Sequence, residues 1–521
     1  MARTIMLQGT SSNVGKSVLT AALCRIFKQD GFKVVPFKSQ NMALNSFVTK
    51  DGGEMGRAQV VQAQAAGLEP AVEMNPILLK PTGNATSQVI VLGKPVRNMG
   101  AKEYHLNFNT TALGVIEDCL KKFHRQYEII VIEGAGSPVE VNLKPRDIAN
   151  MKIAKMADAP VLLVADIDRG GALASIVGTL ELLDPDERDR VAGIIINKFR
   201  GDLDLLRPAL EFIEQKTGKP VLGVVPYFRD FSIPEEDSVA LEERKCNVLR
   251  QDSGNKLDIV VVRLPHISNF TDFDALALEM DVELRYVEDE EKVGQPDLII
   301  LPGSKNTIAD MEFLEQNGLA GAIKNAHVNG VPVIGICGGY QMLGEWLHDP
   351  LQTESNLGSK KGLGLLAMET YFEPEKITTQ VEAEVCGTGS FLASCRGQRV
   401  TGYEIHMGRT TLKGDLQPAF YLTKRGGKEC SEWDGAVNDK GDVLGTYLHG
   451  IFDNDEFRRH LLNVLRQKKG WAPLGESTAS FALQLERDFD KLAEVVRSSL
   501  QMDLLYKIMG VERGERSWAI S

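Results

Sequence analysis

The chain has 521 residues, more than one hydrophobic core usually organises, so its length predicts two or more domains. The hydrophobic (43%) and charged (25%) fractions are those of an ordinary globular protein, and no apolar run approaches the roughly 18 residues of a membrane span. A formal charge of −12 argues against general nucleic-acid binding, which needs a basic face for the phosphates. We expect a cytoplasmic protein that works without nucleic acid or membrane.

The cysteines and histidines give no pattern typical of a metal site. The seven cysteines are widely spaced and include no C-x-x-C pair, so they indicate neither a disulfide framework nor zinc. The histidines also lack the spacing of metal ligands. We therefore expect no transition metal that belongs to the protein itself.

The first half of the chain alternates short apolar runs with helical stretches. Runs this rich in β-branched residues suit strands buried on both faces, as in a parallel sheet covered by helices. The expected strands lie at residues 3–9, 33–39, 128–136, 160–168, 191–199 and 220–227. They predict a first α/β domain over residues 1–232.

The pattern stops in a polar and charged stretch, residues 233–256, which we interpret as a linker. A second series of apolar runs predicts another α/β domain over residues 257–460. Its expected strands lie at residues 257–265, 282–287, 297–304, 331–339 and 443–448. Residues 461–521 have helical spacing, and we expect their helices to pack on the second domain.

A phosphate-binding loop is predicted in LQGTSSNVGKS, residues 7–17, between the first expected strand and a helix. The pattern G-x-x-x-x-G-K-[ST] is present except that Thr10 takes the first glycine position. Backbone N–H groups and the helix N-terminus would hold phosphate, Lys16 would neutralise its oxygens, and Ser17 would bind Mg²⁺. The expected ATP-binding residues of the loop are Thr10, Ser11, Ser12, Asn13, Val14, Gly15, Lys16 and Ser17. The alternative is a simple glycine-serine turn with a solvated lysine.

Two further strand ends carry polar residues that fit a nucleotide site. Glu133 ends the run EIIVIE, where a carboxylate could hold Mg²⁺, although strand-end carboxylates also serve structural roles. Asn197 and Lys198 end the run IIINK and are candidates for contact with the adenine base. Ligands of open parallel sheets bind at the carboxyl ends of strands, which favours both assignments.

The motifs resemble those of known families. GTSSNVGKS is similar to the altered phosphate loop of the dethiobiotin synthetase group. PFKSQNMALNS, EMGRAQ, EGAGSPVEVNL and DIDRGGALASIVGT together resemble the cobyric acid synthase family, and the resemblance covers nearly the whole chain. It implies a first domain that uses ATP and Mg²⁺ to phosphorylate a corrinoid carboxylate, giving an acyl phosphate that ammonia attacks. The candidate substrate contacts in this domain are Lys38, Gln40, Asn41 and Asn45.

In the second domain, the stretch GICGG places Cys337 after an apolar strand and before a helix. In G-x-C-x-G, a sharp turn directs the middle side chain outward, and the glycines lack the Cβ atoms that would collide. A helix N-terminus favours the thiolate, and His449 in GTYLHGIF is available as a base at another strand end. The alternative for Cys337 is a small buried side chain at a tight turn.

These features resemble the class I glutamine amidotransferase domain, in which Cys337 would attack the glutamine amide and His449 would transfer protons. The oxyanion would be held by backbone N–H groups near Gly338 and at Gly303 or Ser304. The family pattern has a glutamate two residues after the histidine, where this chain has Ile451. The third member of a triad is therefore open.

Two residues of GYEIHMG bear on that question. Glu404 is a candidate for the missing acid. His406 is expected to contact the substrate or the other domain, since a histidine in an alternating strand is more often structural or substrate-facing than catalytic.

Together these features predict a P-loop NTPase-like parallel-sheet domain followed by a class I glutamine amidotransferase-like, flavodoxin-like α/β domain with C-terminal helices. The resemblance to cobyric acid synthases implies amidation of the b, d, e and g carboxylates of adenosylcobyrinic acid a,c-diamide, with corrinoid, glutamine and ATP as small-molecule substrates. One alternative is the a,c-diamide synthase of the same pathway, which the sequence KSQNMALNS disfavours. Others are a partitioning-type ATPase switch and a regulatory protein with an inactive glutaminase half. The oligomeric state is left open.

Overall fold

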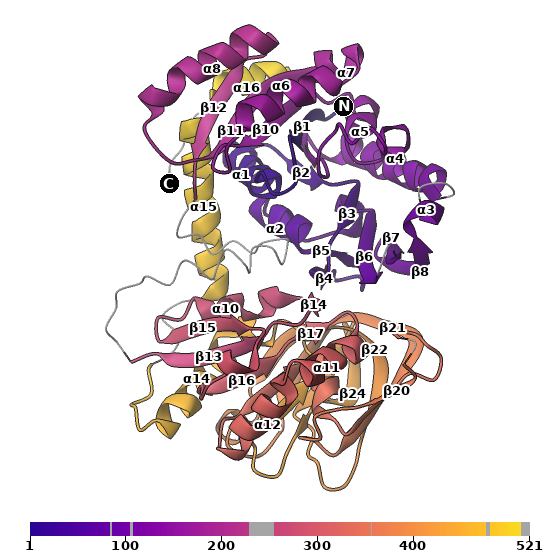
Figure 1. The fold of residues 1–521 in the computed structure, drawn as a ribbon, viewed down its shortest axis with the longest axis vertical. Helices are drawn as coiled ribbons and strands as arrows, with labels where there is room; N and C mark the ends of the chain where they lie inside the picture. Colours follow the sequence, from indigo (N-terminus) through magenta and orange to yellow (C-terminus); the bar gives the residue numbers. More distant parts are fainter. Residues whose placement is uncertain (84–85, 105–107, 229–254, 356, 476–479, 512–521) are drawn as a thin grey trace. The chain divides into compact units, whose positions relative to one another are not determined.

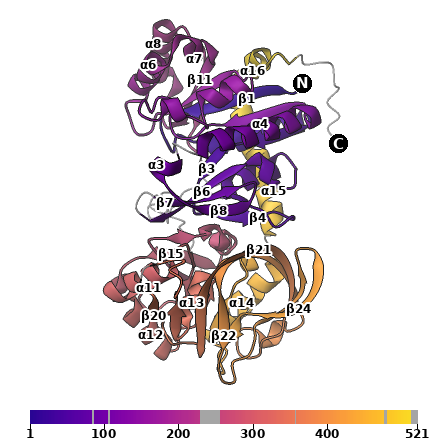
Figure 2. The same ribbon diagram turned by 90° about the vertical axis from the view of Figure 1, so that its right-hand side faces the viewer.

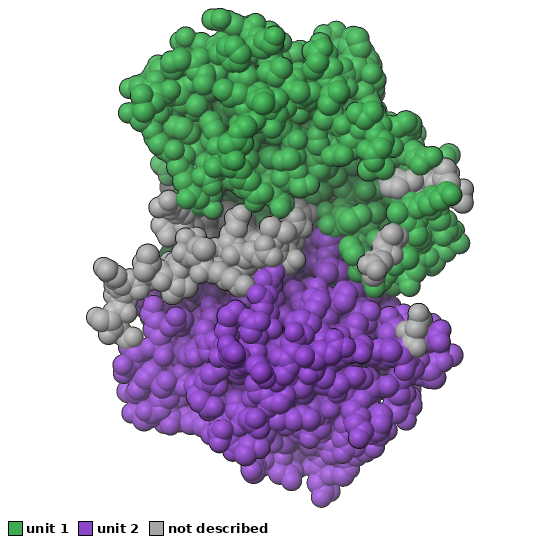
Figure 3. Space-filling model, in the orientation of Figure 1, with its two compact units in different colours: residues 1–42, 58–233, 485–521 green, residues 43–57, 234–484 purple. Residues whose placement is uncertain are grey.

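The computed structural model describes residues 1–83, 86–104, 108–228, 255–355, 357–475 and 480–511 (Figure 1). The expected linker, residues 233–256, lies outside the described residues except for its last two positions. The chain divides into two compact units (Figure 3). Unit 1 comprises residues 1–42, 58–233 and 485–521, and unit 2 comprises residues 43–57 and 234–484.

Unit 1 is built on a six-stranded parallel sheet in the order β12-β11-β10-β1-β9-β2. All six strands coincide with the expected apolar runs, so this prediction is confirmed. β9 has five consecutive buried residues and lies between β1 and β2, which explains why its sequence is apolar on both faces. The strands are β1 (Arg3–Gly9), β2 (Val34–Phe37), β9 (Ile129–Glu133), β10 (Val161–Asp166), β11 (Val191–Phe199) and β12 (Val221–Pro226).

Helices cover this sheet because the strands bury their apolar side chains on both faces. α1 contributes Leu19, Leu23 and Phe27 to the same core as Ile5 and Val131. The helices of the unit are α1 (Lys16–Gln29), α2 (Arg57–Ala65), α3 (Ala101–Glu103), α4 (Asn109–Gln126), α5 (Met151–Met156), α6 (Ala172–Leu182), α7 (Pro185–Arg190) and α8 (Leu203–Thr217).

A second, four-stranded sheet in unit 1 was not expected from the sequence. Its order is β3-β6-β7-β8, with β3 parallel to β6 and the other pairs antiparallel. β8 is mostly exposed, so its sequence KPVRNMG lacks the apolar run on which the strand prediction relied. The strands are β3 (Gln40–Met42), β6 (Ile77–Gly83), β7 (Thr86–Val91) and β8 (Lys94–Gly100).

Unit 2 contains a six-stranded sheet in the order β15-β13-β16-β18-β26-β25, parallel except for β25. Its five parallel strands are those that the sequence predicted. They are β13 (Leu257–Val262), β15 (Val282–Val287), β16 (Leu298–Leu301), β18 (Val333–Ile336) and β26 (Val443–Thr446), with β25 at Ala436–Val437. The helices are α10 (Asp274–Ala277), α11 (Thr307–Gln316), α12 (Leu319–Val328), α13 (Gly338–Leu343) and α14 (Asp455–Lys468).

A largely antiparallel sheet accompanies it and was not foreseen. Its long strands β21 and β22 run side by side as a curved ribbon (Figure 2). Its sequence alternates polar and apolar residues, which is typical of a sheet with one solvated face. The strands are β19 (Trp346–His348), β20 (Ser359–Lys361), β21 (Met368–Val385), β22 (Arg399–Leu412), β23 (Phe420–Arg425) and β24 (Lys428–Asp434).

Residues 43–57 belong to unit 2, although the sequence places them inside the expected first domain. They form the hairpin β4 (Ser46–Val48) and β5 (Glu54–Gly56). Val48 shares a small buried cluster with Tyr403 and Ile405 of β22. The contiguous domain 1–232 is therefore wrong at this segment.

The last helices, α15 (Phe481–Ser499) and α16 (Met502–Met509), correct a second expectation. Phe489 and Leu492 are fully buried in the core of unit 1, not in that of unit 2. Gln501 donates its backbone N–H to Leu222 of β12 at 2.8 Å, and Arg25 of α1 is ion-paired with Asp490 at 2.7 Å. The amphipathic pattern predicted the helices but not which core they complete. Within the described ranges, no helix is long and apolar enough to cross a membrane.

The position of α15 predicts which part of the protein Phe489 stabilises. Phe489→Ala should lower the free energy of unfolding of unit 1 by about 3–5 kcal/mol, because it leaves a cavity in a closed core. Thermal denaturation with and without ATP identifies the transition of unit 1 as the one that nucleotide raises. Leu483→Ala, at a 61% exposed position of the same helix, is the control. If Phe489→Ala lowered only the melting temperature of the transition that ATP leaves unchanged, the assignment of α15 to the core of unit 1 would be wrong.

Candidate functional site

The predicted phosphate loop links β1 to α1 in unit 1. Gly15 precedes the helix with φ +95°, and Asn13 also has a positive φ of 58°, so the loop curls back on itself. Lys16 is buried, and its ammonium donates to the carbonyl oxygens of Ser11 and Gly136, each at 3.1 Å. This geometry, with a lysine held inside a loop before a helix N-terminus, is that of a phosphate site.

The strand-end pair Asn197 and Lys198 contacts this loop. Asn197 Nδ2 donates to Val14 O at 2.8 Å, and Lys198 Nζ donates to Asn13 O at 2.7 Å. Asn197 Oδ1 is buried without a hydrogen-bond partner, so one polar atom of this side chain is left over. Both residues therefore brace the loop, and their contact with adenine stays a prediction.

Glu133, at the end of β9, is 1% exposed and is held by three side chains. Ser17 donates its hydroxyl to Oε1 at 2.8 Å, Lys38 is ion-paired with Oε1 at 3.0 Å, and Gln62 donates to Oε2 at 2.5 Å. The ion pair compensates a carboxylate whose burial would otherwise be costly. Glu133 and the phosphate-loop lysine thus lie at the same edge of the sheet.

The oxygen donors here fit a magnesium ion. Mg²⁺ prefers a carboxylate and a hydroxyl, completed by substrate phosphates and waters, and Ser17 and Glu133 supply the two protein oxygens next to the phosphate loop. The described residues contain no group of three or more His, Cys, Asp or Glu that could hold a metal by themselves.

The other substrate candidates of PFKSQNMALNS occupy different surroundings. Gln40 accepts from Tyr104 at 2.6 Å, and Asn41 donates to Gln59 at 2.8 Å, both within unit 1. Asn45 belongs to unit 2 and accepts from Thr271 at 3.3 Å. Contact of these side chains with the corrinoid stays a prediction.

Cys337 lies at a sharp turn between β18 and α13. Its φ and ψ are 52° and −108°, a conformation that residues other than glycine rarely adopt and that is typical of strained functional turns. A Cβ atom at Gly339 would lie 2.0 Å from Leu301 O, so the glycine is required by the close approach of two backbone segments. The expected strand-turn-helix around Cys337 is confirmed.

His449 carries the hydrogen bond that the sequence left unassigned. Its Nδ1 lies 2.7 Å from Oδ2 of Asp272, and both side chains are buried. The second carboxylate oxygen of Asp272 accepts from Gly450 N at 3.1 Å, which fixes the carboxylate. The acid that orients the histidine is therefore Asp272, supplied by a short helical turn at Phe270–Phe273.

The electrostatics of His449 follow from these neighbours. Burial alone would lower its pKa, but the charges of Asp272 and Cys337 and the hydrogen bond with Asp272 raise the pKa of His449 to about 10. At neutral pH the imidazole is therefore protonated. Its other nitrogen, Nε2, is buried without a hydrogen-bond partner in the resting protein, as expected of an atom that exchanges protons with a thiol and a substrate.

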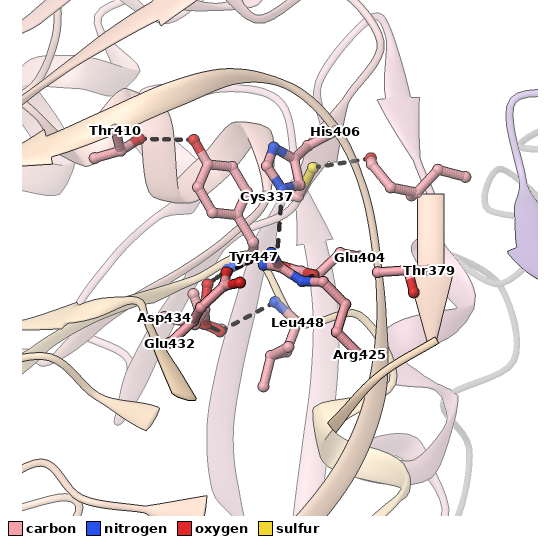
Figure 4. Close-up of polar contacts among 12 residues, drawn as sticks. Cys337, Thr379, Glu404, His406, Thr410, Arg425, Glu432, Asp434, Tyr447 and Leu448 are labelled. Atoms are coloured by element: carbon pink, nitrogen blue, oxygen red, sulfur yellow. Dashed lines mark hydrogen bonds and ion pairs between the residues drawn. The ribbon is translucent and has the colours of Figure 1, made fainter. Parts of the chain in front are cut away.

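Glu404 is not the third member of the triad. It forms two hydrogen bonds with Arg425, both at 2.9 Å, and lies 3.8 Å from His406 (Figure 4). Burial would raise the pKa of Glu404, but His406 and Arg425 hold it below its usual value. The expectation that Glu404 replaces the missing glutamate is wrong, because its carboxylate is already engaged. Ile451, at the family's glutamate position, is buried in the hydrophobic core.

His406 lies on β22 and stacks on Tyr447, with ring centroids 3.7 Å apart. Its Nδ1 is 3.2 Å from Gly408 O, and the side chain is buried. Cys337 Sγ lies 3.6 Å from Ile405 O, on the same strand (Figure 4). His406 is thus part of the packing beside the cysteine, and its contact with a substrate stays a prediction.

The expected oxyanion donors surround the same turn. Gly303 and Ser304 form β17, which pairs with β14 (Ile267–Ser268). A Cβ atom at Gly338 would lie 2.8 Å from Ser304 N, and one at Gly303 would lie 3.1 Å from His449 Cε1. The structure therefore brings together the three predicted backbone groups, Cys337 and His449.

Asp272 was missed because no local motif marks it. It lies in SNFTDFD, where several polar residues resemble an ordinary turn, and only the fold brings it to a histidine far along the chain. One signal was available. The absent glutamate required another buried carboxylate near a strand end of the second domain.

Comparisons with known proteins agree with both halves of this geometry. Residues 5–240 match the CobQ/CobB/MinD/ParA nucleotide binding domain, and residues 258–457 match the CobB/CobQ-like glutamine amidotransferase domain. The chain is 58% identical to a cobyric acid synthase of Pelotomaculum thermopropionicum over 98% of its length and 97% of the relative. Cobyric acid synthases of Moorella thermoacetica (58%) and Dehalococcoides mccartyi (53%) are also similar over at least 98% of both chains.

The chain belongs to the cobyric acid synthase family. This confirms the family that the sequence motifs indicated, and with it the two-domain fold class. Residues 1–42 and 58–228 carry the nucleotide-binding fold, and unit 2 carries the amidotransferase fold.

The triad predicts a specific change in pH dependence. Asp272→Asn should reduce the rate of glutamine hydrolysis by about 10²-fold or more, because the imidazole loses the group that orients it. Removing a negative charge that raises the pKa of His449 lowers that pKa, so the alkaline limb of the rate profile should move to lower pH. Glu404→Gln is the matched comparison. The triad assignment is wrong if Glu404→Gln moves that limb and Asp272→Asn does not.

Proposed function

We propose that the protein makes cobyric acid from adenosylcobyrinic acid a,c-diamide by amidating its b, d, e and g side-chain carboxylates, with ATP and glutamine as the other substrates. The proposal is supported by one combination of observations. A phosphate loop with a buried carboxylate in unit 1 accompanies a Cys337–His449–Asp272 arrangement in unit 2. Each half supplies what the other needs for forming an amide.

The nucleotide-binding unit activates the carboxylate. A carboxylate resists attack by ammonia because its carbon is electron-rich and oxide is a very poor leaving group. An oxygen of the substrate carboxylate attacks the γ-phosphorus of ATP, the bond to ADP breaks, and an acyl phosphate forms. Lys16 and the backbone N–H groups of the loop neutralise the charge on the transferring phosphoryl group.

The amidotransferase unit supplies neutral ammonia. The Cys337 thiolate attacks the glutamine amide carbon, backbone N–H groups near Gly338 and Ser304 stabilise the oxyanion, and His449 gives its proton to the leaving nitrogen. Water then cleaves the thioester to glutamate with His449 as the base. Ammonia attacks the acyl phosphate, phosphate leaves and a proton is lost, which completes the amide.

We assign a magnesium site to Ser17 and Glu133. When bound, Mg²⁺ would neutralise charge on the nucleotide's phosphates. Lys38 and Gln62, which hold Glu133 by an ion pair and a hydrogen bond, keep its buried carboxylate oriented beside Ser17.

The proposed corrinoid specificity rests on family membership, since the relatives compared above are cobyric acid synthases. The residues we propose for its recognition are Lys38, Gln40, Asn41, Asn45 and His406. The decisive experiment incubates the purified chain with the a,c-diamide, MgATP and glutamine, and counts added amides by mass spectrometry. Four amide groups are expected. A product without added amides would exclude this function.

If Cys337 is the nucleophile, its loss should affect amidation with glutamine but not amidation with ammonium. Cys337→Ala should abolish amidation with glutamine, because alanine cannot form the thioester, and high ammonium at alkaline pH should restore it. The acyl phosphate chemistry lies in the other unit and is retained. Parallel assays with glutamine and with ammonium chloride, beside a thermal melt, make the measurement. A structural cysteine predicts equal losses with both nitrogen sources, together with a lower melting temperature.

The magnesium assignment predicts an effect on metal dependence. Glu133→Gln should raise the Mg²⁺ concentration needed for half-maximal amidation, because an amide oxygen is a weaker ligand for a hard cation than a carboxylate. The measurement titrates MgCl₂ at fixed ATP with ammonium as the nitrogen source, which removes the glutaminase from the assay. Glu128→Gln, just before the same strand and exposed, is the matched control. An unchanged magnesium dependence would return Glu133 to a structural role.

A further inference from the structure

The residues that flank the 43–57 segment on both sides include one whose side chain binds Glu133. Lys38, shortly before the segment, is ion-paired with Glu133, and Gln62, shortly after it, donates to the other oxygen of the same carboxylate. Arg57, the last residue of the segment, is the first residue of the helix that carries Gln62. A change in the surroundings of Glu133 therefore acts on both ends of this segment through short, structured pieces of chain.

The beginning of the segment is hydrogen-bonded to the loop that carries the triad acid. Asn45 Oδ1 accepts from the Thr271 hydroxyl at 3.3 Å, and Ser46 N donates to Asn269 Oδ1 at 3.1 Å. Both contacts are buried. Asn269 has a φ of 53°, and its carbonyl accepts from Asp272 N at 3.0 Å. The segment thus holds the residues that set the position of the Asp272 carboxylate.

The segment also contacts the ring that packs on the histidine. Tyr403 stacks on His449 with centroids 5.3 Å apart and pairs with it through two backbone hydrogen bonds. The Tyr403 hydroxyl accepts from Asn269 Nδ2 at 3.2 Å and donates to Ser46 O at 3.4 Å. Phe47 packs edge-on against the same ring at 5.1 Å. The 43–57 segment is therefore in contact with Tyr403 and with Asn269 and Thr271, which lie in the same loop as Asp272.

The hairpin of the segment is fixed to unit 2. Glu54 is fully buried and ion-paired with Lys376 of β21 at 2.5 Å, and Gln380 donates to Val48 O at 2.9 Å. Removing one partner of such a buried ion pair strongly destabilises the fold, because the other charge is left buried without compensation. The hairpin is thus anchored to unit 2. Movement of the flanking chain would therefore act on the residues nearest the ends of the segment, which include Asn45 and Ser46.

We propose that the 43–57 segment couples the ATP site to the glutaminase triad, with Thr271 and Tyr403 as positioning residues that transmit the state of Glu133 to Asp272 and His449. The proposal rests on the function proposed above. When Ser17 and Glu133 turn toward a nucleotide-bound cation, Lys38 and Gln62 lose their hold on the carboxylate and rearrange. The contacts at Asn45 and Ser46 then favour the aligned triad, so that glutamine is hydrolysed when the acyl phosphate can be made.

The test removes one hydroxyl at a time from this contact. Thr271→Val and Tyr403→Phe keep the shape of the side chains, and each loses a hydrogen bond to the segment. Glutamine hydrolysis is measured alone and with MgATP plus the a,c-diamide, and amidation is measured with ammonium. The stimulation of hydrolysis by MgATP and corrinoid should fall about fivefold or more in each variant, the lower end of usual coupling between sites. Amidation with ammonium should stay within about twofold of the wild-type rate, since the nucleotide site is untouched.

Thr423→Val and Tyr421→Phe are matched controls on β23, and neither residue contacts the segment or the triad in the described structure. Hydrogen exchange of residues 267–273 gives a second readout, which should change with MgATP in the wild-type chain and not in Thr271→Val. Unchanged stimulation, or an equal fall in basal and stimulated hydrolysis, would overturn the coupling. Equal losses with both nitrogen sources and a lower melting temperature would also overturn it. Failure of the proposed function would look different, because the wild-type chain itself would then amidate with neither nitrogen source.

Discussion

The buried carboxylate of Glu133 is the constraint on which the nucleotide-binding unit depends. A charge at the end of a fully buried strand is tolerated only when it is compensated, and Lys38, Ser17 and Gln62 provide that compensation. Lys38 directly follows β2, Ser17 lies in α1, and Gln62 lies in α2. One electrostatic requirement thus ties together the elements around the phosphate loop, and the same carboxylate is the magnesium ligand proposed above.

The amidotransferase unit solves a similar problem with a different partner. Asp272 is buried, and it is compensated by the imidazolium of His449 instead of a lysine. The pair is stable because each charge favours the other, which is why the pKa of His449 is raised to about 10 despite its burial. In both units, then, a buried acid is paired with a basic side chain, Lys38 in one and His449 in the other.

The predictability of the structure from sequence follows the range of the interactions involved. The eleven apolar runs predicted parallel strands correctly, because burial on both faces leaves a local signal. The phosphate loop at Gly15–Lys16 and the turn at Gly335–Gly339 could also be predicted, because a tight turn limits the residue types at adjacent positions. Three features could not be predicted because they depend on contacts between distant segments. They are the pairing of Asp272 with His449, the membership of residues 43–57 in unit 2, and the packing of Phe489 in the core of unit 1. An amphipathic helix shows that it has a buried face but not which surface buries it.

The proton balance explains why the triad needs an acid with a strong hold on the imidazole. Ammonia must leave glutamine as a neutral molecule, since ammonium has no lone pair with which to attack the acyl phosphate. In the proposed mechanism, His449 gives one proton to the leaving nitrogen, and its neutral ring then accepts a proton from the water that cleaves the thioester. Asp272 stabilises the imidazolium at the start and the end of this cycle and keeps Nδ1 protonated in between. The histidine therefore returns to the same charge after each glutamine, and one neutral ammonia molecule is released for each glutamine hydrolysed.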